Sequence, residues 1–271
     1  MIQHFQKRIA LPADQSTWLY LLSPLFIGLF AAGSFLAAHL FLIIAALALF
    51  LFSKPALLVA KIRSGQHPQD DLPTAGFWAM LYALGLLASF SQLFAMGYGR
   101  LFYLALPWLL LLFWRLSSIG KGADTDNPIV EIIYSGTLAA AAPAAYWVGL
   151  GAYDDAGWWL WALCWLQSAA AIFYVHLRDE QRQLDQMPPL GERLKMGRCA
   201  LIITSANLLL VAAMAQLGRL PALLWLPYLL QLLEAVWGTL KPAASAKTET
   251  IGRRQLIVGI LFTILFIIYW R

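Results

Sequence analysis

The sequence predicts an all-α protein, a polytopic membrane helical bundle with about nine transmembrane helices. Of the 271 residues, 61% are hydrophobic and only 12% are charged, whereas soluble domains carry roughly 25% charged residues. The apolar residues gather in runs of roughly 20, the length a helix needs to cross the hydrocarbon of a bilayer. Most lysines and arginines lie in alternate segments between these runs, which is typical of a multi-pass protein.

Nine apolar runs are the predicted spans, and we expect them to form a single transmembrane domain over residues 1–271. Residues 1–16 are polar and carry no cleavable signal, so they are predicted to be a cytoplasmic N-terminal segment. Residues 17–60 are too long for one helix, and Gly33, Ser34 and His39 mark the expected turn. The spans are residues 17–36, 39–60, 74–95, 101–117, 128–149, 158–177, 197–217, 221–240 and 253–270.

The segments between the spans differ on the two sides of the predicted membrane. Short turns rich in glycine occur at Gly97–Arg100 and at Gly151–Asp155. An aromatic belt is predicted directly after the second turn, where Trp158 begins a tryptophan-rich stretch. Pro221 suits the start of the eighth span. The opposite loops are longer and more basic.

The distribution of basic residues predicts the orientation. Sixteen of the nineteen lysines and arginines fall on the side that holds the N-terminus, and three fall on the far side. The N-terminus should therefore be cytoplasmic in the cell inner membrane. The sixteen are Lys7, Arg8, Lys54, Lys61, Arg63, Arg115, Lys121, Arg178, Arg182, Arg193, Lys195, Arg198, Lys241, Lys247, Arg253 and Arg254; the three are Arg100, Arg219 and Arg271.

Candidate binding residues lie at the end of the sixth span. If its helix continues past the bilayer, Tyr174, Arg178 and Arg182 share one face at intervals of four residues. Two arginines so spaced repel each other mildly, and an anion between them would turn this repulsion into binding. The simpler interpretation is that both arginines only anchor the helix to headgroups.

Glu131 is the second candidate. Asn127 suits an N-cap and Pro128 a first helical residue, so Glu131 falls in the first turn, where the helix dipole favours a carboxylate. Alternatively it faces the bundle interior, where it could pair with Arg178 or Arg182 or carry a proton.

The loop after the second span offers Lys54, Lys61 and Arg63, which could contact phosphate or serve only as topology signals. His67 and Asp70 could ligate a metal, but Pro68 interrupts their spacing, so no metal site is predicted. No catalytic motif occurs, and no catalytic residue is predicted. Three isolated polar residues in spans are expected to hydrogen-bond neighbouring helices: His39, Gln92 and Glu234.

The N-terminal Pro12-Ala-Asp-Gln-Ser-Thr-Trp18 is similar to the Pro-x-Glu-His-Gly-Ala-Trp opening of the YwiC-like bacterial membrane proteins. Glu131 with Pro143-Ala-Ala-Tyr146 resembles that family's middle segment, and Tyr174-Val-His-Leu-Arg178 resembles its Tyr-Val-Arg-Leu-Arg run. The chain is thus identified as a divergent member. Its departures from the family pattern are Gln15, Ser16 and His176.

A weaker, architectural resemblance links the chain to the UbiA-type intramembrane prenyltransferases. Those enzymes hold magnesium and a prenyl diphosphate with aspartate-rich motifs in two cytoplasmic loops. Here the matching loops hold only Asp70 and Asp71, and Asp179 and Asp185. Because the second pair does not lie on one helical face, the motifs are not intact. If the protein is an enzyme, the resemblance implies prenyl transfer with magnesium.

Three functions follow from these observations. The first is binding of an isoprenoid or another anionic lipid in a UbiA-like bundle, with Lys54, Lys61, Arg63, Arg178 and Arg182 around the phosphate. The second is a non-catalytic assembly partner of another membrane protein. The third is a small proton-coupled transporter that uses Glu131. Membrane lipids are expected partners in each case, and nucleic acid is not, because the positive charge is placed as a topology signal.

Overall fold

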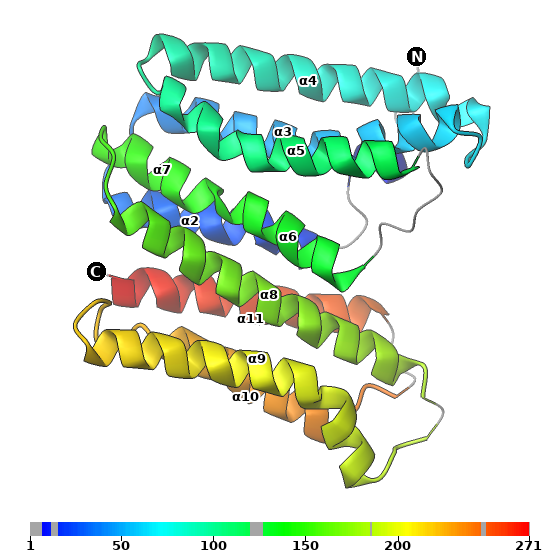
Figure 1. Ribbon diagram of the computed structural model, residues 1–271, viewed down its shortest axis with the longest axis vertical. Helices are drawn as coiled ribbons and strands as arrows, with labels where there is room; N and C mark the ends of the chain where they lie inside the picture. The colour runs from blue at the N-terminus through cyan, green and yellow to red at the C-terminus, as the bar shows by residue number, and fades with distance from the viewer. Residues whose placement is uncertain (1–6, 12–15, 120–126, 185, 245–247, 271) are drawn as a thin grey trace. The chain divides into compact units, whose positions relative to one another are not determined.

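A computed structural model describes residues 7–11, 16–119, 127–184, 186–244 and 248–270 (Figure 1). Within these ranges the chain folds into α-helices joined by short turns and contains no strand, which confirms the all-α prediction. Part of the N-terminal YwiC-like motif lies outside the described residues, as do five residues used above: Gln15, Lys121, Asp185, Lys247 and Arg271.

Each predicted span contains at least one helix. Seven helical segments in the described ranges are long and apolar enough to cross a membrane. A multi-pass membrane protein is therefore confirmed. The other two spans contain helices of only 14 and 15 residues, α2 and α10, so the total of nine stays a prediction. The helices are α1 (Lys7–Ala10), α2 (Leu19–Ala32), α3 (Ala37–Arg63), α4 (Leu72–Ala95), α5 (Phe102–Ile119), α6 (Pro128–Ala139), α7 (Ala141–Leu150), α8 (Ala156–Arg182), α9 (Leu190–Gln216), α10 (Leu226–Leu240) and α11 (Thr248–Trp270).

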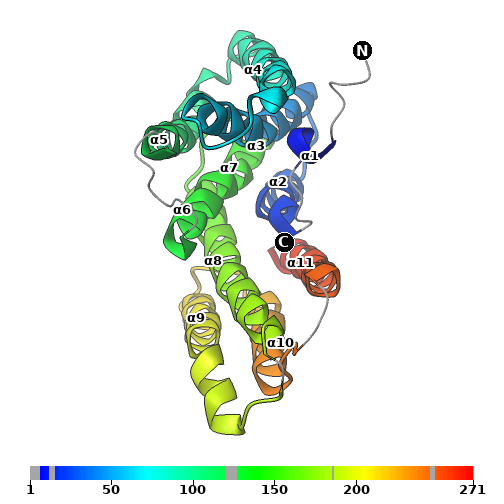
Figure 2. The same ribbon diagram turned by 90° about the vertical axis from the view of Figure 1, so that its right-hand side faces the viewer.

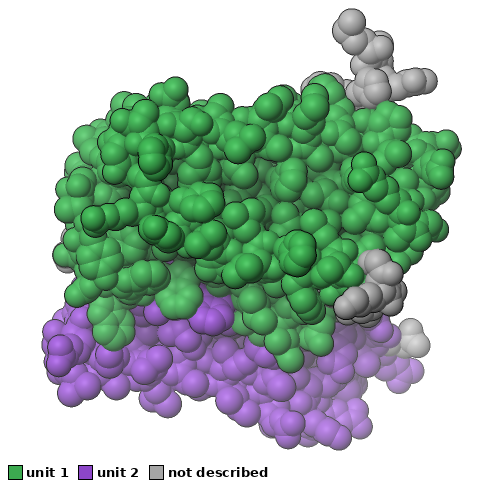
Figure 3. Space-filling view, turned by 45° about the horizontal axis from the view of Figure 1, so that its top comes forward, with its two compact units in different colours: residues 1–161 green, residues 162–271 purple. Residues whose placement is uncertain are grey.

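The chain divides into two compact units, residues 1–161 (unit 1) and 162–271 (unit 2), which Figure 3 colours separately. In unit 1, α3 packs along α4 and also contacts α5 and α7, while α2 packs along α6 and α7 (Figure 2). Gly28 permits a close approach of α2 to α7, because a Cβ atom on it would overlap the carbonyl oxygen of Ala142. The two backbones meet there directly.

Glycine and proline explain where the helices of unit 1 end. Gly33 ends α2 with φ 71°, a left-handed conformation that costs glycine little, so the predicted turn is confirmed there, whereas His39 lies inside α3. The predicted fifth span is two helices that meet at Ala140. Pro143 accounts for this break, because it has no N–H for the carbonyl of Ala139 and its ring crowds that group.

His39 joins the first turn of α3 to α7. Its Nδ1 accepts a hydrogen bond from the backbone N–H of Leu36 at 2.9 Å, so its Nε2 carries the proton and donates to the carbonyl of Ala145 at 3.0 Å. This polar residue therefore serves a neighbouring helix, as predicted.

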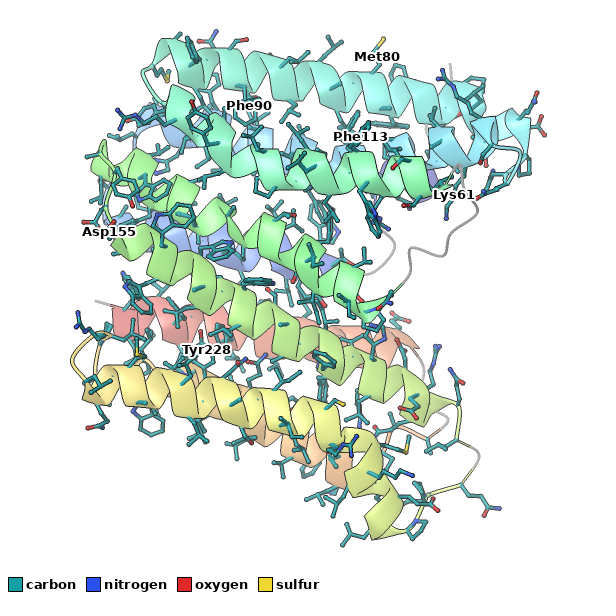
Figure 4. All side chains as sticks on the ribbon, viewed as in Figure 1. Lys61, Met80, Phe90, Phe113, Asp155 and Tyr228 are labelled. Atoms are coloured by element: carbon teal, nitrogen blue, oxygen red, sulfur yellow. The ribbon has the colours of Figure 1, made fainter. Side chains whose placement is uncertain are left out.

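In unit 2, α10 packs against α9 and α11 and is hydrogen-bonded to α8. The hydroxyl of the buried Tyr228, labelled in Figure 4, donates to the carbonyl of Leu163 at 2.9 Å. Helix α10 begins at Leu226 rather than at the predicted Pro221, and Pro227 occupies its first turn instead. The first residues of the predicted eighth span form turns.

The connections of unit 1 lie at its two opposite ends. Lys61 marks one end and Asp155 the other (Figure 4). The turn between α4 and α5, which holds Arg100, lies at the Asp155 end (Figure 1). We call the end of unit 1 that holds Lys61 and Arg63 its basic end.

Candidate anion-binding site

Four of the seven predicted binding residues lie in unit 1. Lys61 and Arg63 are exposed in the last turn of α3. Two turns earlier in the helix, the Nζ of Lys54 donates to the carbonyl of Leu11 at 2.7 Å. Glu131 is half-buried in the first turn of α6. Asn127 caps that helix, because its side chain accepts a hydrogen bond from the N–H of Ile129 at 2.9 Å. The N-cap is confirmed; pairing of Glu131 with a basic group stays a prediction.

The other three predicted residues lie in unit 2, on α8. This helix continues to Arg182, so Tyr174, Arg178 and Arg182 do share one face, as the spacing predicted. Arg182 is partly exposed, and its Nε lies 3.9 Å from Asp179. That distance and exposure indicate a weak surface pair.

The guanidinium group of Arg178 binds the C-terminal end of a neighbouring helix, α10. It is buried, and its Nη1 donates to the carbonyls of Gly238 at 3.0 Å and Lys241 at 2.9 Å. It also donates to the side-chain oxygen of Gln181 at 3.0 Å. The last carbonyls of a helix have no partner within the helix and carry partial negative charge. Arg178 therefore acts as a cap for α10, and we leave it out of the anion site.

Beside this cap lies a hydrogen-bonded network that joins three helices. The hydroxyl of Tyr174 donates to Glu234 Oε1 at 2.7 Å. Arg254 reaches the same carboxylate with two nitrogens, Nε to Oε1 at 2.7 Å and Nη2 to Oε2 at 2.8 Å. Glu234 lies six residues before the end of α10 and Arg254 six residues after the start of α11. At 1.5 Å per residue, both lie about 9 Å into their antiparallel helices, which explains why they meet.

The two residues of the ion pair, Arg254 and Glu234, differ in exposure to solvent. The side chain of Arg254 is 40% exposed, and that of Glu234 only 11%. Trp237, an exposed residue, lies beside Arg254, and its ring is close to two cations. Lys241 Nζ lies 4.0 Å from the ring centroid and Arg254 Cζ lies 5.6 Å from it, both within the range of cation–π attraction. We call Trp237, Lys241 and Arg254 the headgroup cluster.

Sequence reasoning did not assign these residues to a site. It expected Glu234 to bond a neighbouring helix, which the network confirms, but it counted Arg254 and Lys241 only as topology signals. The sequence does contain a signal for this ion pair. A carboxylate inside an apolar span requires a partner, and Arg254 lies in the next span at the same depth as Glu234.

Unit 1 also contains an apolar cavity, between α2, α3, α4, α5, α6 and α7. Phe90, Trp108 and a set of alanines line it, and its volume is about 60 Å³. Pockets that hold small ligands usually measure roughly 300–1,000 Å³. This cavity is therefore too small to enclose an isoprenoid chain.

Metal-ligating side chains do not gather in the described ranges: no group of three or more His, Cys, Asp or Glu residues could hold an ion there. The magnesium that prenyl transfer would need stays an untested expectation.

Comparison with known families adds one result. Residues 11–125 match the family model described as YwiC-like protein. The resemblance to the YwiC-like family is confirmed over this range. The match includes Lys54, Lys61 and Arg63 and ends before Glu131, so the resemblance of the later segments stays a prediction. No curated protein and no solved structure matches the chain.

Proposed function

We propose that the protein binds anionic lipids in the bacterial inner membrane, with its N-terminus in the cytoplasm. The headgroup cluster carries this proposal, because it presents two cations close to the ring of an exposed tryptophan. A guanidinium group suits the oxygens of a phosphate, and an ammonium group adds a compact positive charge. Tryptophan prefers the membrane–water boundary, where headgroups lie.

The basic end of unit 1 supports the same function. Lys61 and Arg63 are exposed there, beyond the apolar part of α3. Each positive charge near an anionic membrane surface contributes about 1 kcal/mol of attraction. The lipid's apolar chain would lie along exposed apolar helix surface, because the cavity of unit 1 is too small to enclose it. Phosphorylated isoprenoids and anionic glycerolipids share this phosphate-and-chain chemistry.

The proposal is tested by the lipid that co-purifies with the full-length protein, identified by native mass spectrometry and lipid extraction. Arg254→Gln should lose most of the bound anionic lipid. Arg253→Gln, which removes an exposed neighbouring arginine, is the matched control and should keep it. Equal lipid content in wild type and Arg254→Gln would overturn the proposal. The extracted lipids distinguish isoprenoid phosphates from glycerolipids.

Proton-coupled transport is the second candidate, supported by the ion pair in unit 2 rather than by Glu131. One turn of α10 before Glu234, the buried Oε1 of Gln231 has no hydrogen-bond partner among the described residues. Ionisable groups among membrane helices often mark proton or substrate paths. Proton flux into proteoliposomes that is lost in Glu234→Gln would favour transport. No observation favours the assembly-partner function, which co-purification of another membrane protein would support.

A further inference from the structure

A pocket of about 300 Å³ opens at the Asp155 end of unit 1. Its walls come from the turn between α4 and α5 and from the end of α7 with the turn that follows. The volume reaches the range of roughly 300–1,000 Å³ that is usual for small-ligand sites. The volume of this pocket is five times that of the apolar cavity, about 300 against 60 Å³. None of its lining residues belongs to the headgroup cluster.

Arg100 supplies the pocket with a positive charge. The residue is exposed, and its side chain forms no ion pair or hydrogen bond with another residue in the described ranges. Its position is also unusual, because the positive-inside rule disfavours basic residues on this side of the predicted membrane. Arg100 is thus poorly explained as a topology signal and is available to an anion.

Aromatic rings form the adjoining wall. The rings of Trp147 and Tyr153 lie with centroids 5.1 Å apart at an interplanar angle of 39°. Their polar atoms are engaged elsewhere: Trp147 Nε1 donates to the carbonyl of Asp154 at 2.7 Å, and the hydroxyl of Tyr153 donates to Asp155 at 2.7 Å. The rings therefore offer mainly apolar and π surface. Tyr98 lines the same pocket.

The acidic residues of this end have hydrogen-bond partners within their own turn. Asp155 accepts the hydroxyl of Tyr153, and Asp154 Oδ1 accepts the backbone N–H of Ala156 at 2.8 Å. The bond to Asp155 raises the pKa of the Tyr153 hydroxyl above its usual range, so this group stays a neutral donor. Both carboxylates thus hold the turn together.

We propose that this pocket binds a small organic carboxylate that carries a ring. The guanidinium of Arg100 would bind the carboxylate through two parallel hydrogen bonds, and the ring would pack against Trp147 and Tyr153. This site is independent of the proposed lipid binding, because it lies at the opposite end of unit 1 from Lys61.

The test uses benzoate as the probe and the full-length protein in nanodiscs, with affinity measured by isothermal titration calorimetry. Wild type should bind benzoate at least 10-fold more tightly than acetate, which lacks the ring. Arg100→Gln should weaken benzoate binding on the order of 10- to 100-fold, the usual value of hydrogen bonds to a charged group. Arg219→Gln, which removes an exposed arginine of a turn in unit 2, is the control and should bind as wild type does.

A second variant tests the aromatic wall separately. Tyr153→Leu removes a ring without changing the charge, and it should weaken benzoate binding while leaving the weak binding of acetate unchanged. The inference is overturned if wild type binds no benzoate at millimolar concentration, if Arg100→Gln binds as tightly as wild type, or if acetate and benzoate bind equally well.

Discussion

Arg254 holds Glu234 with two nitrogens, at 2.7 and 2.8 Å, and the arginine is the more exposed partner of the pair. This arrangement gives Arg254 two possible acceptors, the protein's own carboxylate and an anion that arrives from outside. It also makes the energetic roles of the two residues unequal. Glu234 depends on Arg254 and Tyr174 for its hydrogen bonds, whereas Arg254 has access to its surroundings and to Trp237.

Loss of Arg254 should therefore destabilise the protein more than loss of Glu234. Arg254→Gln leaves a largely buried carboxylate without its counter-ion, and this should lower the free energy of unfolding by about 2–4 kcal/mol. Glu234→Gln leaves an arginine that is 40% exposed, so its cost should be about 1 kcal/mol. Chemical unfolding in detergent micelles measures both. An equal loss in the two variants would contradict the predicted asymmetry.

The cap on α10 predicts a strong effect at Arg178. Arg178→Gln removes the group that satisfies two carbonyls at the end of α10, and it should destabilise unit 2 by about 2–3 kcal/mol. Arg182→Gln is the matched control on the same helix face. Because the pair of Arg182 with Asp179 is long and exposed, this variant should cost less than about 0.5 kcal/mol. Arg178→Gln with wild-type stability would show that the cap is unimportant.

Close backbone packing predicts intolerance at Gly28. A methyl group there would overlap the carbonyl oxygen of Ala142, a backbone atom that cannot move away by rotating a side chain. Gly28→Ala should cost about 1–3 kcal/mol as overpacking. Gly76→Ala in α4 is the control, since a Cβ atom there meets nothing within 4 Å, and it should be neutral or slightly stabilising. The midpoint of thermal unfolding distinguishes the two.

The topology is tested by reporter fusions at Gly65 and at Asp155. Gly65 follows α3 in the loop beside Lys61, and Asp155 lies at the other end of unit 1. A reporter active only in the cytoplasm should work at Gly65 and fail at Asp155. The same sidedness at both positions would contradict the predicted orientation.

The fold was largely predictable because apolar runs and turn residues are local signals. The lengths of the runs located the helices, and Gly33 identified the end of α2 correctly. The break at Ala140 was missed, since the sequence was interpreted as one continuous span despite Pro143. Hydropathy cannot reveal such a break, because both sides of it are equally apolar.

The site was less predictable because its parts depend on tertiary contacts. Four-residue spacing placed Tyr174, Arg178 and Arg182 on one face correctly, but it could not show that Arg178 turns toward the end of α10. Similarly, the pairing of Glu234 with Arg254 requires two antiparallel helices in register. A count of charges by side carries no information about either contact.

The most direct measurement of the central claim is the affinity of full-length protein for a soluble short-chain phosphatidylglycerol, compared in wild type and Glu234→Gln. If Arg254 serves an external phosphate, removing its internal competitor should tighten binding on the order of 10-fold. Glu249→Gln makes the same change of charge in the first turn of α11 and should change the affinity much less. Binding that weakens in Glu234→Gln as much as in Arg254→Gln would contradict the account, because it would show that the pair only fastens α10 to α11.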